Sequence, residues 1–247
     1  MLYVHYTGVS KLFTFLMDIG KALTYYTKDE KFVSVVAMFS LLLLSCIFIL
    51  PILFTGPLMV GYTVEIVRRI QNGDYSLPEI AYTDFWKKGI MLVLVQIAVG
   101  VLFMFLQLLL TVPLSLIGLA GTSSVRSSDY SYGDGGGSGL LYLGTSMVSQ
   151  LISLVFGFIQ TVVSYAMIAI YARTDNVNSL FNFGNYKKLW ANNGANLIIL
   201  PIVSGIVGGV IGFIGFLAFC IGILPASVVA TLIQAGLIGQ VDTKEVA

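Results

Sequence analysis

The chain has 247 residues, of which 57% are hydrophobic and only 10% are charged, and its formal net charge is +1. Soluble domains carry about 25% charged residues, so this composition excludes an ordinary water-soluble protein. The sequence has no continuous basic face, which excludes a nucleic-acid partner.

Four long segments contain no charged residue, namely Phe32–Val64, Gly89–Val125, Leu140–Ala172 and Leu189–Val241. About 20 helical residues cross a bilayer core of roughly 30 Å, so each segment is long enough for at least one crossing. We therefore predict an all-α integral membrane protein. Its single membrane domain would contain about six transmembrane helices, arranged as three hairpins that are each preceded by an interfacial amphipathic helix.

The first interfacial helix is predicted over residues 9–28. Lys11, Asp18, Lys21 and other polar residues recur there every three or four positions, with apolar residues between them. This is the pattern of a helix that lies flat in the membrane interface.

Residues 32–72 form the first predicted hairpin. Pro51 and the Gly56-Pro57 pair interrupt the apolar run, and we expect the chain to reverse in this region. The second leg, from about Pro57 to Asn72, is short, on the order of 24 Å at 1.5 Å per residue. It either spans a thin region of the membrane or forms a re-entrant half-helix.

The second unit occupies residues 78–172. After the strong turn signal Asn72-Gly73-Asp74, the tripeptide Leu77-Pro78-Glu79 is expected to begin an interfacial helix. That helix would carry Phe85, Trp86, Lys87 and Lys88, an aromatic and basic cluster typical of a membrane anchor.

Two transmembrane legs follow, and the Gly/Ser-rich residues 122–139 join them as a flexible loop. Gln96 and Gln107 are the strongly polar residues of the first leg, and we expect them to form interhelical hydrogen bonds.

The third unit occupies residues 178–240. Aromatic and lysine residues in Asn178–Asn193 predict a third interfacial helix, and Pro225 interrupts the apolar run that follows. This run also carries a helix-packing face of small residues: Ser204, Gly205, Gly208, Gly209 and Gly212. Small residues at this spacing let two helix backbones approach closely, either inside the chain or at a subunit interface.

Two hexapeptides indicate an internal repeat. Cys46–Pro51 (CIFILP) and Cys220–Pro225 (CIGILP) differ at a single position, and each lies where an apolar run is expected to turn back. We infer a pseudo-repeat of three related units.

The distribution of basic residues predicts the orientation in the cell membrane. With three hairpins, every Lys and Arg except Arg126 falls on one side of the membrane. Basic loops mark the cytoplasm, so both termini should be cytoplasmic and residues 122–139 external. The following basic residues are candidates for contacts with lipid headgroups or a partner subunit: Arg68, Arg69, Lys87, Lys88, Lys187 and Lys188.

Several short elements in residues 22–89 resemble those of a known family. They are Ala22-Leu23-x-Tyr25-Tyr26, Asp29-x-Lys31-Phe32, Gly61-Tyr62, Arg68-Arg69, Gly73, Leu77-Pro78-Glu79, Asp84-Phe85 and Gly89. With these elements the chain resembles a bacterial and archaeal family of multi-pass membrane proteins, catalogued only as a domain of unknown function (family 4013). The resemblance implies a membrane fold, and it brings no activity, ligand or catalytic residue.

The sequence lacks the motifs of nucleophilic, phosphate-loop and metal-dependent chemistry, and its one histidine is His5. We therefore expect no enzyme and no catalytic, cofactor-binding or metal site. The favoured function is a structural or accessory membrane component that organises lipid, assembles with itself or belongs to a larger complex. The alternative is a channel or facilitator for a neutral or lipid-like solute, lined by Gln96, Gln107, Gln150, Gln160, Ser164 and Gln234.

Overall fold

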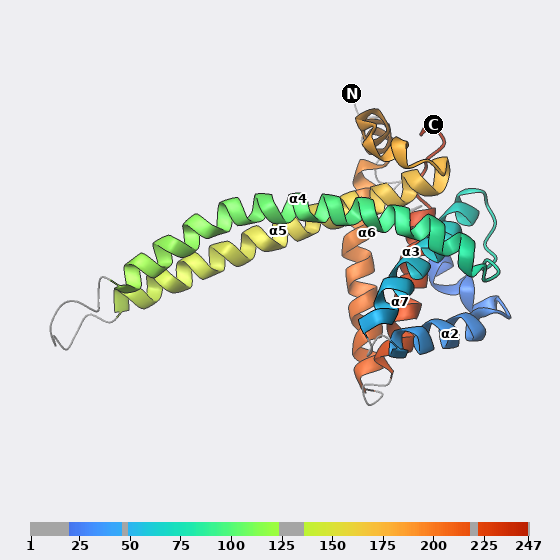
Figure 1. The fold of residues 1–247 in the computed structure, drawn as a ribbon, viewed down its shortest axis with the longest axis horizontal. Coiled ribbons are helices and arrows are strands. Elements are labelled where there is room, and N and C mark those ends of the chain that lie inside the picture. The colour runs from blue at the N-terminus through green and yellow to red at the C-terminus, as the bar shows by residue number, and fades with distance from the viewer. Residues whose placement is uncertain (1–19, 46–48, 124–135, 218–221, 247) are drawn as a thin grey trace, which may run out of the picture. The chain divides into compact units, whose positions relative to one another are not determined.

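The computed structural model describes residues 20–45, 49–123, 136–217 and 222–246 (Figure 1). Every regular element within these ranges is a helix, and no strand occurs among them. In chain order the elements are η1 (Tyr26–Lys28), α2 (Phe32–Ser45), α3 (Ile49–Gln71), α4 (Tyr82–Ser123), α5 (Gly136–Thr174), η2 (Val177–Phe181), α6 (Phe183–Leu217) and α7 (Ile223–Gly239).

Three of these helices are long and apolar enough to cross a membrane: Tyr82–Ile117, Leu143–Thr174 and Phe183–Leu217. In the most apolar 18-residue stretch of each helix, only 11–17% of the residues are buried inside the protein, so most of their hydrophobic side chains face outward. Exposed apolar surface of this extent requires lipid or another subunit to cover it. The predicted all-α membrane class is therefore confirmed at this coarse level.

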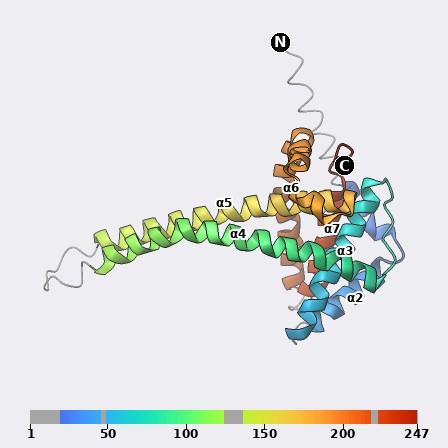
Figure 2. The same ribbon diagram turned by 45° about the horizontal axis from the view of Figure 1, so that its top comes forward.

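The chain divides into two compact units. The first consists of Met1–Val95 and Val162–Ala247, and the second of Gln96–Thr161. The second unit is a helical hairpin in which the outer parts of α4 and α5 run side by side in both views (Figures 1 and 2). Gln107 Nε2 donates a hydrogen bond to Ser153 Oγ across this hairpin at 2.8 Å. The predicted interhelical role of Gln107 is thus confirmed.

Helix α7 forms the core of the first unit, where it packs against α2, α3 and α6. Its C-terminal half is buried almost continuously, because two glycines allow close neighbours. A Cβ atom added at Gly236 would lie 2.8 Å from the Tyr25 ring, and one at Gly239 would lie 2.7 Å from Ile70 Cβ.

The predicted breaks at Pro51 and at Gly56-Pro57 are wrong, because α3 is continuous from Ile49 to Gln71. Pro51 lies in the first turn, where a missing N–H costs no hydrogen bond. Pro57 lies inside the helix, and its carbonyl would be 1.7 Å from a Cβ atom added at Gly89 of α4.

Helices α3 and α7 begin at equivalent positions of the two hexapeptides. Their first residues are Ile49 and Ile223, and in each helix the proline is the third residue. Residues 46–48 and 218–221, which overlap the two hexapeptides, lie outside the described residues, as do 1–19 of the first interfacial helix and 124–135 of the Gly/Ser loop.

The helix expected to begin at Pro78 begins instead at Tyr82. Residues 75–81 are not helical, because Pro78 disfavours the helical conformation of Leu77 and tertiary hydrogen bonds hold this segment. No separate interfacial helix follows, since α4 continues without interruption to Ser123.

The third predicted interfacial segment is the start of α6, preceded by η2. Asn193 at its end has non-helical dihedral angles (φ −132°, ψ 15°), so the helix kinks there. The Asn193 amide donates to the Asp242 carbonyl at 2.7 Å and accepts from the Asp242 amide at 3.2 Å. The kink therefore ties α6 to the segment that follows α7.

Replacement of Gly89 by alanine tests the close crossing of α3 and α4. The new methyl group would collide with the backbone of Pro57 and Gly61, so we expect a loss of about 3 kcal/mol or failure to fold. The measurement is the thermal unfolding midpoint in detergent.

Gly157→Ala on α5 is the matched control, because no described atom lies within 4 Å of a Cβ atom there. We expect a neutral or slightly stabilising effect, up to about 1 kcal/mol. Equal midpoints for the two variants would contradict the crossing.

Candidate functional site: a charged cleft

The first unit contains a cleft of about 390 Å³ that is lined by opposite charges. We call it the charged cleft. Its lining residues come from the η1–α2 junction, α3, residues 76–81 and the first turns of α4: Asp29, Lys31, Glu65, Arg69, Ser76, Leu77, Pro78, Glu79, Ala81, Asp84, Phe85 and Lys88. Four of them are acidic and three are basic, so opposite charges nearly balance.

The chain leaves α3 through a tight turn that shapes one side of the cleft. Gly73 has a positive φ of 84°, and its amide donates to the Ile70 carbonyl at 2.9 Å. The Asp74 amide donates to the Arg69 carbonyl, also at 2.9 Å. These two bonds and the left-handed glycine form a Schellman motif, which satisfies the last carbonyls of the helix. The predicted Asn72-Gly73-Asp74 turn is confirmed.

Asp29 joins the two parts of the chain that border the cleft. Its Oδ2 accepts from the Leu77 amide at 2.8 Å, and its Oδ1 accepts from the Lys31 amide at 2.9 Å. Lys31 Nζ in turn lies 3.0 Å from Glu79 Oε1. A carboxylate that accepts backbone amides fixes a loop better than an exposed ion pair does, so Asp29 is the principal link.

Glu65 is the centre of the second charge network. Its Oε2 lies 3.1 Å from Lys88 Nζ and 3.5 Å from Arg68 Nη1, and its side chain is only 19% exposed. Arg68 also donates from Nε to the Ala172 carbonyl at 2.9 Å and approaches Asp175 Oδ1 at 2.6 Å. Since that carbonyl lies in the last turn of α5, the guanidinium also stabilises a helix C-terminus.

Aromatic side chains pack together next to these charged residues. The Tyr62 ring lies 5.1 Å from Phe39 and 5.5 Å from Phe85, with the second pair edge to face. The Tyr62 hydroxyl donates to the Pro78 carbonyl at 3.5 Å. This contact adds to the Asp29 bond in holding residues 77 and 78 out of a helix.

Two carboxyl groups near the cleft have lowered pKa values. The hydrogen bond from the Ser76 amide lowers the pKa of Asp74, and the hydrogen bond from Lys31 lowers the pKa of Glu79. A pKa that is lower in the folded state stabilises the fold above the ordinary carboxyl pKa. This stability is lost as the pH falls through the folded value. Both groups are exposed to solvent, so their contributions are small.

Comparison with known proteins identifies the family. The model of the family described as "Protein of unknown function (DUF4013)" matches residues 43–237, about four fifths of the chain. The chain belongs to this family. The resemblance inferred from the sequence is thereby confirmed. No curated protein and no solved structure matches the chain.

Within this DUF4013 chain, four of the eight elements that carry the family resemblance contribute residues to the charged cleft: Asp29-x-Lys31-Phe32, Arg68-Arg69, Leu77-Pro78-Glu79 and Asp84-Phe85. Asp29 and Lys31 precede the matched region, whereas the cleft residues on α3 and α4 lie inside it. Of the charged residues in the cleft, sequence reasoning singled out Arg69 and Lys88 and missed Asp29, Lys31, Glu65, Glu79 and Asp84. The sequence could have indicated Asp29 and Asp84, because both lie in the family elements. It could not indicate that the two residues line the same cleft.

The six basic residues predicted to contact headgroups or partners fall into three groups. Arg69 and Lys88 line the charged cleft, and Arg68 lies beside it in internal ion pairs. Lys87 is exposed on another face of α4, and Lys187 and Lys188 are exposed near the start of α6. The cleft therefore brings together only part of the predicted set.

The small-residue face of α6 is open in the described structure. No described atom lies within 4 Å of a Cβ atom built at Gly205, Gly208, Gly209 or Gly212. Ser204 differs from them, because its hydroxyl lies 2.8 Å from the Tyr165 hydroxyl.

Three of the four carboxylates that line the cleft are held by cations or backbone amides. The described residues hold no group of three or more His, Cys, Asp or Glu side chains that could bind a metal ion. Glu65 and Glu79 are paired with lysine or arginine, and Asp29 is occupied by backbone amides.

Glu65→Gln tests the inner charge network. The substitution leaves Lys88 and Arg68 close together without the carboxylate that they share. We expect a loss of about 2 kcal/mol in unfolding free energy, measured by thermal unfolding in detergent.

Glu79→Gln provides the matched control, because the Glu79 side chain is 85% exposed and its ion pair with Lys31 lies in solvent. We expect little or no change in the unfolding midpoint. A larger loss for Glu79→Gln than for Glu65→Gln would contradict the assigned roles.

Proposed function

We propose that the protein is a non-enzymatic accessory component of the cell membrane. It organises lipid, assembles with further copies of itself, or stabilises a larger membrane complex. The charged cleft and the exposed lysines supply its polar contacts, and the long apolar helices supply its contacts within the bilayer.

The observation that carries this proposal is the apolar surface of the second unit. Large hydrophobic side chains are exposed on both of its helices, including Leu102 (56%), Phe105 (58%), Leu109 (56%), Leu151 (63%) and Leu154 (68%). A hairpin of two helices cannot bury these side chains itself. The proposed function gives them lipid or subunit partners.

The finer topology is also part of the proposal. We propose six crossings in three hairpins, with both termini in the cytoplasm and residues 122–139 outside. The equivalent starts of α3 and α7 support the pseudo-repeat. The 23 residues of α3 extend about 35 Å, and Glu65, Arg68 and Arg69 lie in its last two turns.

Contacts with lipid headgroups are proposed chiefly for Lys87, Lys187 and Lys188, because these side chains are exposed. Each positive charge near an anionic surface contributes about 1 kcal/mol. Self-association is proposed through the open glycine face of α6, where a second helix could approach closely.

The alternative function, a channel or facilitator, has weaker support. Gln107 is hydrogen-bonded to Ser153, and Gln234 is hydrogen-bonded to the Tyr165 hydroxyl. Amide side chains that satisfy a partner within the protein are less suited to replace the hydration shell of a passing solute.

Native mass spectrometry of the full chain in mild detergent tests the proposed function. We expect a mass larger than one chain, from an oligomer or a complex that retains lipid. Gly208→Leu should shift the distribution toward the monomer, because the added side chain covers the open face.

Val210→Leu is the control, since Val210 is a large residue already exposed on α6. A lone monomer that carries a solute across liposome membranes would contradict the accessory function and support the alternative.

A further inference from the structure

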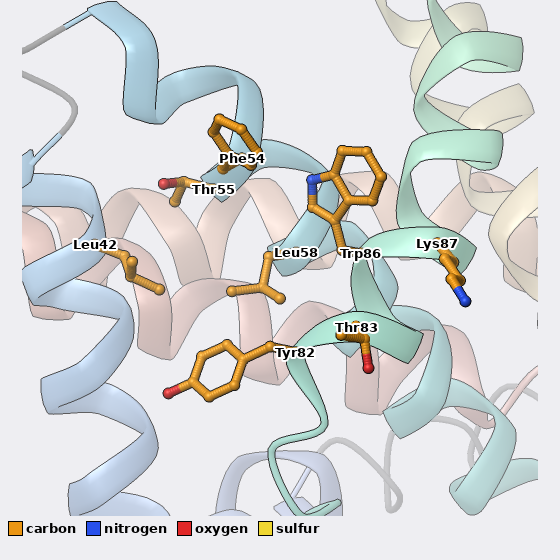
Figure 3. A pocket seen from close by; sticks show the side chains of 8 residues that line it. All are labelled: Leu42, Phe54, Thr55, Leu58, Tyr82, Thr83, Trp86 and Lys87. Atoms are coloured by element: carbon orange, nitrogen blue, oxygen red, sulfur yellow. The ribbon is translucent and has the colours of Figure 1, made fainter.

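A second cavity of the first unit, of about 420 Å³, lies where α2, α3 and the first turns of α4 meet (Figure 3). We call it the apolar groove. It is lined by Leu42, Phe54, Thr55, Leu58, Tyr82, Thr83, Trp86 and Lys87. Its volume falls within the range of small-molecule sites, about 300–1,000 Å³. The walls are mainly aliphatic and aromatic, with Phe54 stacked on Trp86 at a centroid distance of 6.2 Å.

Two polar atoms in this groove lack hydrogen-bond partners. Thr55 is only 3% exposed, and its hydroxyl has no partner among the described residues. The Trp86 indole nitrogen is likewise buried and unpaired there. Figure 3 shows this nitrogen on the side of the ring that faces Phe54 and Thr55. Buried donors without acceptors are unfavourable and uncommon, so the groove has two donors in need of acceptor oxygens.

The chemistry of the donors restricts the ligand. An indole N–H can only donate, and a threonine hydroxyl can donate or accept. Both groups can donate hydrogen bonds to carbonyl oxygens. The rest of the ligand must be apolar, because the walls of the groove are mainly aliphatic and aromatic. A protein helix does not meet this requirement, because its carbonyl oxygens are already occupied within the helix.

The residues at the rim of the groove indicate the depth in the membrane at which the ligand lies. Tyr82 is 55% exposed, and its hydroxyl donates to Met38 Sδ at 3.2 Å. Lys87 is exposed next to Trp86 in the same helical turn. Tryptophan, tyrosine and lysine gather at the membrane–water interface, between the acyl chains and the phosphates of lipids.

We propose that the apolar groove binds one diacyl glycerophospholipid. An acyl chain lies against Leu42, Phe54 and Leu58, the two ester carbonyls accept hydrogen bonds from Trp86 and Thr55, and Lys87 attracts the phosphate. The site rests on the membrane location in the proposed function, and it does not depend on self-assembly.

Trp86 itself provides the readout. The chain has two tryptophans, Trp86 and Trp190, so Trp190→Phe leaves Trp86 as the sole source of tryptophan fluorescence. The full chain in detergent micelles is titrated with phosphatidylglycerol that carries brominated acyl chains. We expect saturable quenching. The diether analogue, with the same headgroup and chains but no carbonyls, should bind about two- to tenfold more weakly, because it cannot accept these bonds.

Two variants that each remove one donor test the site in a competition measured by native mass spectrometry. Trp86→Phe and Thr55→Val should each retain about two- to tenfold less ester lipid than the parent. Each should show a smaller preference for ester over ether lipid than the parent, because each retains only one of the two donors. Trp190→Phe is the control and should retain the parent's preference, since Trp190 is a 51% exposed tryptophan distant in sequence from the groove.

The unfolding temperature of Thr55→Val distinguishes a ligand-binding role of the Thr55 hydroxyl from a structural one. In lipid-free detergent, Thr55→Val should unfold at the same or a higher temperature than the parent, because it removes an unpaired buried hydroxyl. Added ester lipid should then raise the midpoint less than it does for the parent.

Equal affinity for ester and ether lipids, or undiminished lipid retention by both variants, would overturn the site. Either result would leave the oligomeric mass unchanged, so failure of the site is distinguishable from failure of the proposed function.

Discussion

The close approach of α3 and α4 at Gly61 and Gly89 is the contact on which the rest of the first unit depends. A Cβ atom at Gly61 would lie 1.8 Å from the Phe85 carbonyl oxygen, so the two backbones touch without side chains between them. This contact places the first turns of α4 between two cavities. Asp84, Phe85 and Lys88 line the charged cleft, and Tyr82, Thr83 and Trp86 line the apolar groove.

The first turns of α4 are therefore amphipathic: one face lines the charged cleft, and the other lines the apolar groove. The helical period of 3.6 residues separates positions 84, 85 and 88 from positions 82, 83 and 86. Lys88 on the first face forms an ion pair with Glu65 of α3. The second face meets the apolar side chains of Leu42 and Leu58. The polar segment between the first apolar runs is thus a structural joint, and both candidate binding sites arise from it.

The second unit is stabilised in a different way from the first. Its hairpin is held by a few specific contacts, including the Gln107–Ser153 hydrogen bond and the edge-to-face rings of Phe103 and Phe156. The remaining apolar side chains face outward, as expected when lipid is as apolar as the helix surface and burial inside the protein gives little advantage. Stability in this unit depends on the bilayer more than on a packed core.

The sequence by itself determined the helical membrane class, the family, the turn at Gly73 and the interhelical role of Gln107. These follow from local properties: long uncharged runs, a glycine at a helix end and an isolated amide in an apolar helix. Only the tertiary structure decided that α3 continues through Pro57, that residues 75–81 are not helical, and that Asp29 meets Leu77. Each of these depends on a partner far away in the chain. Glu65 and Arg68 show the same limit, because the sequence gives their charges, whereas helix packing decides that they pair inside the protein.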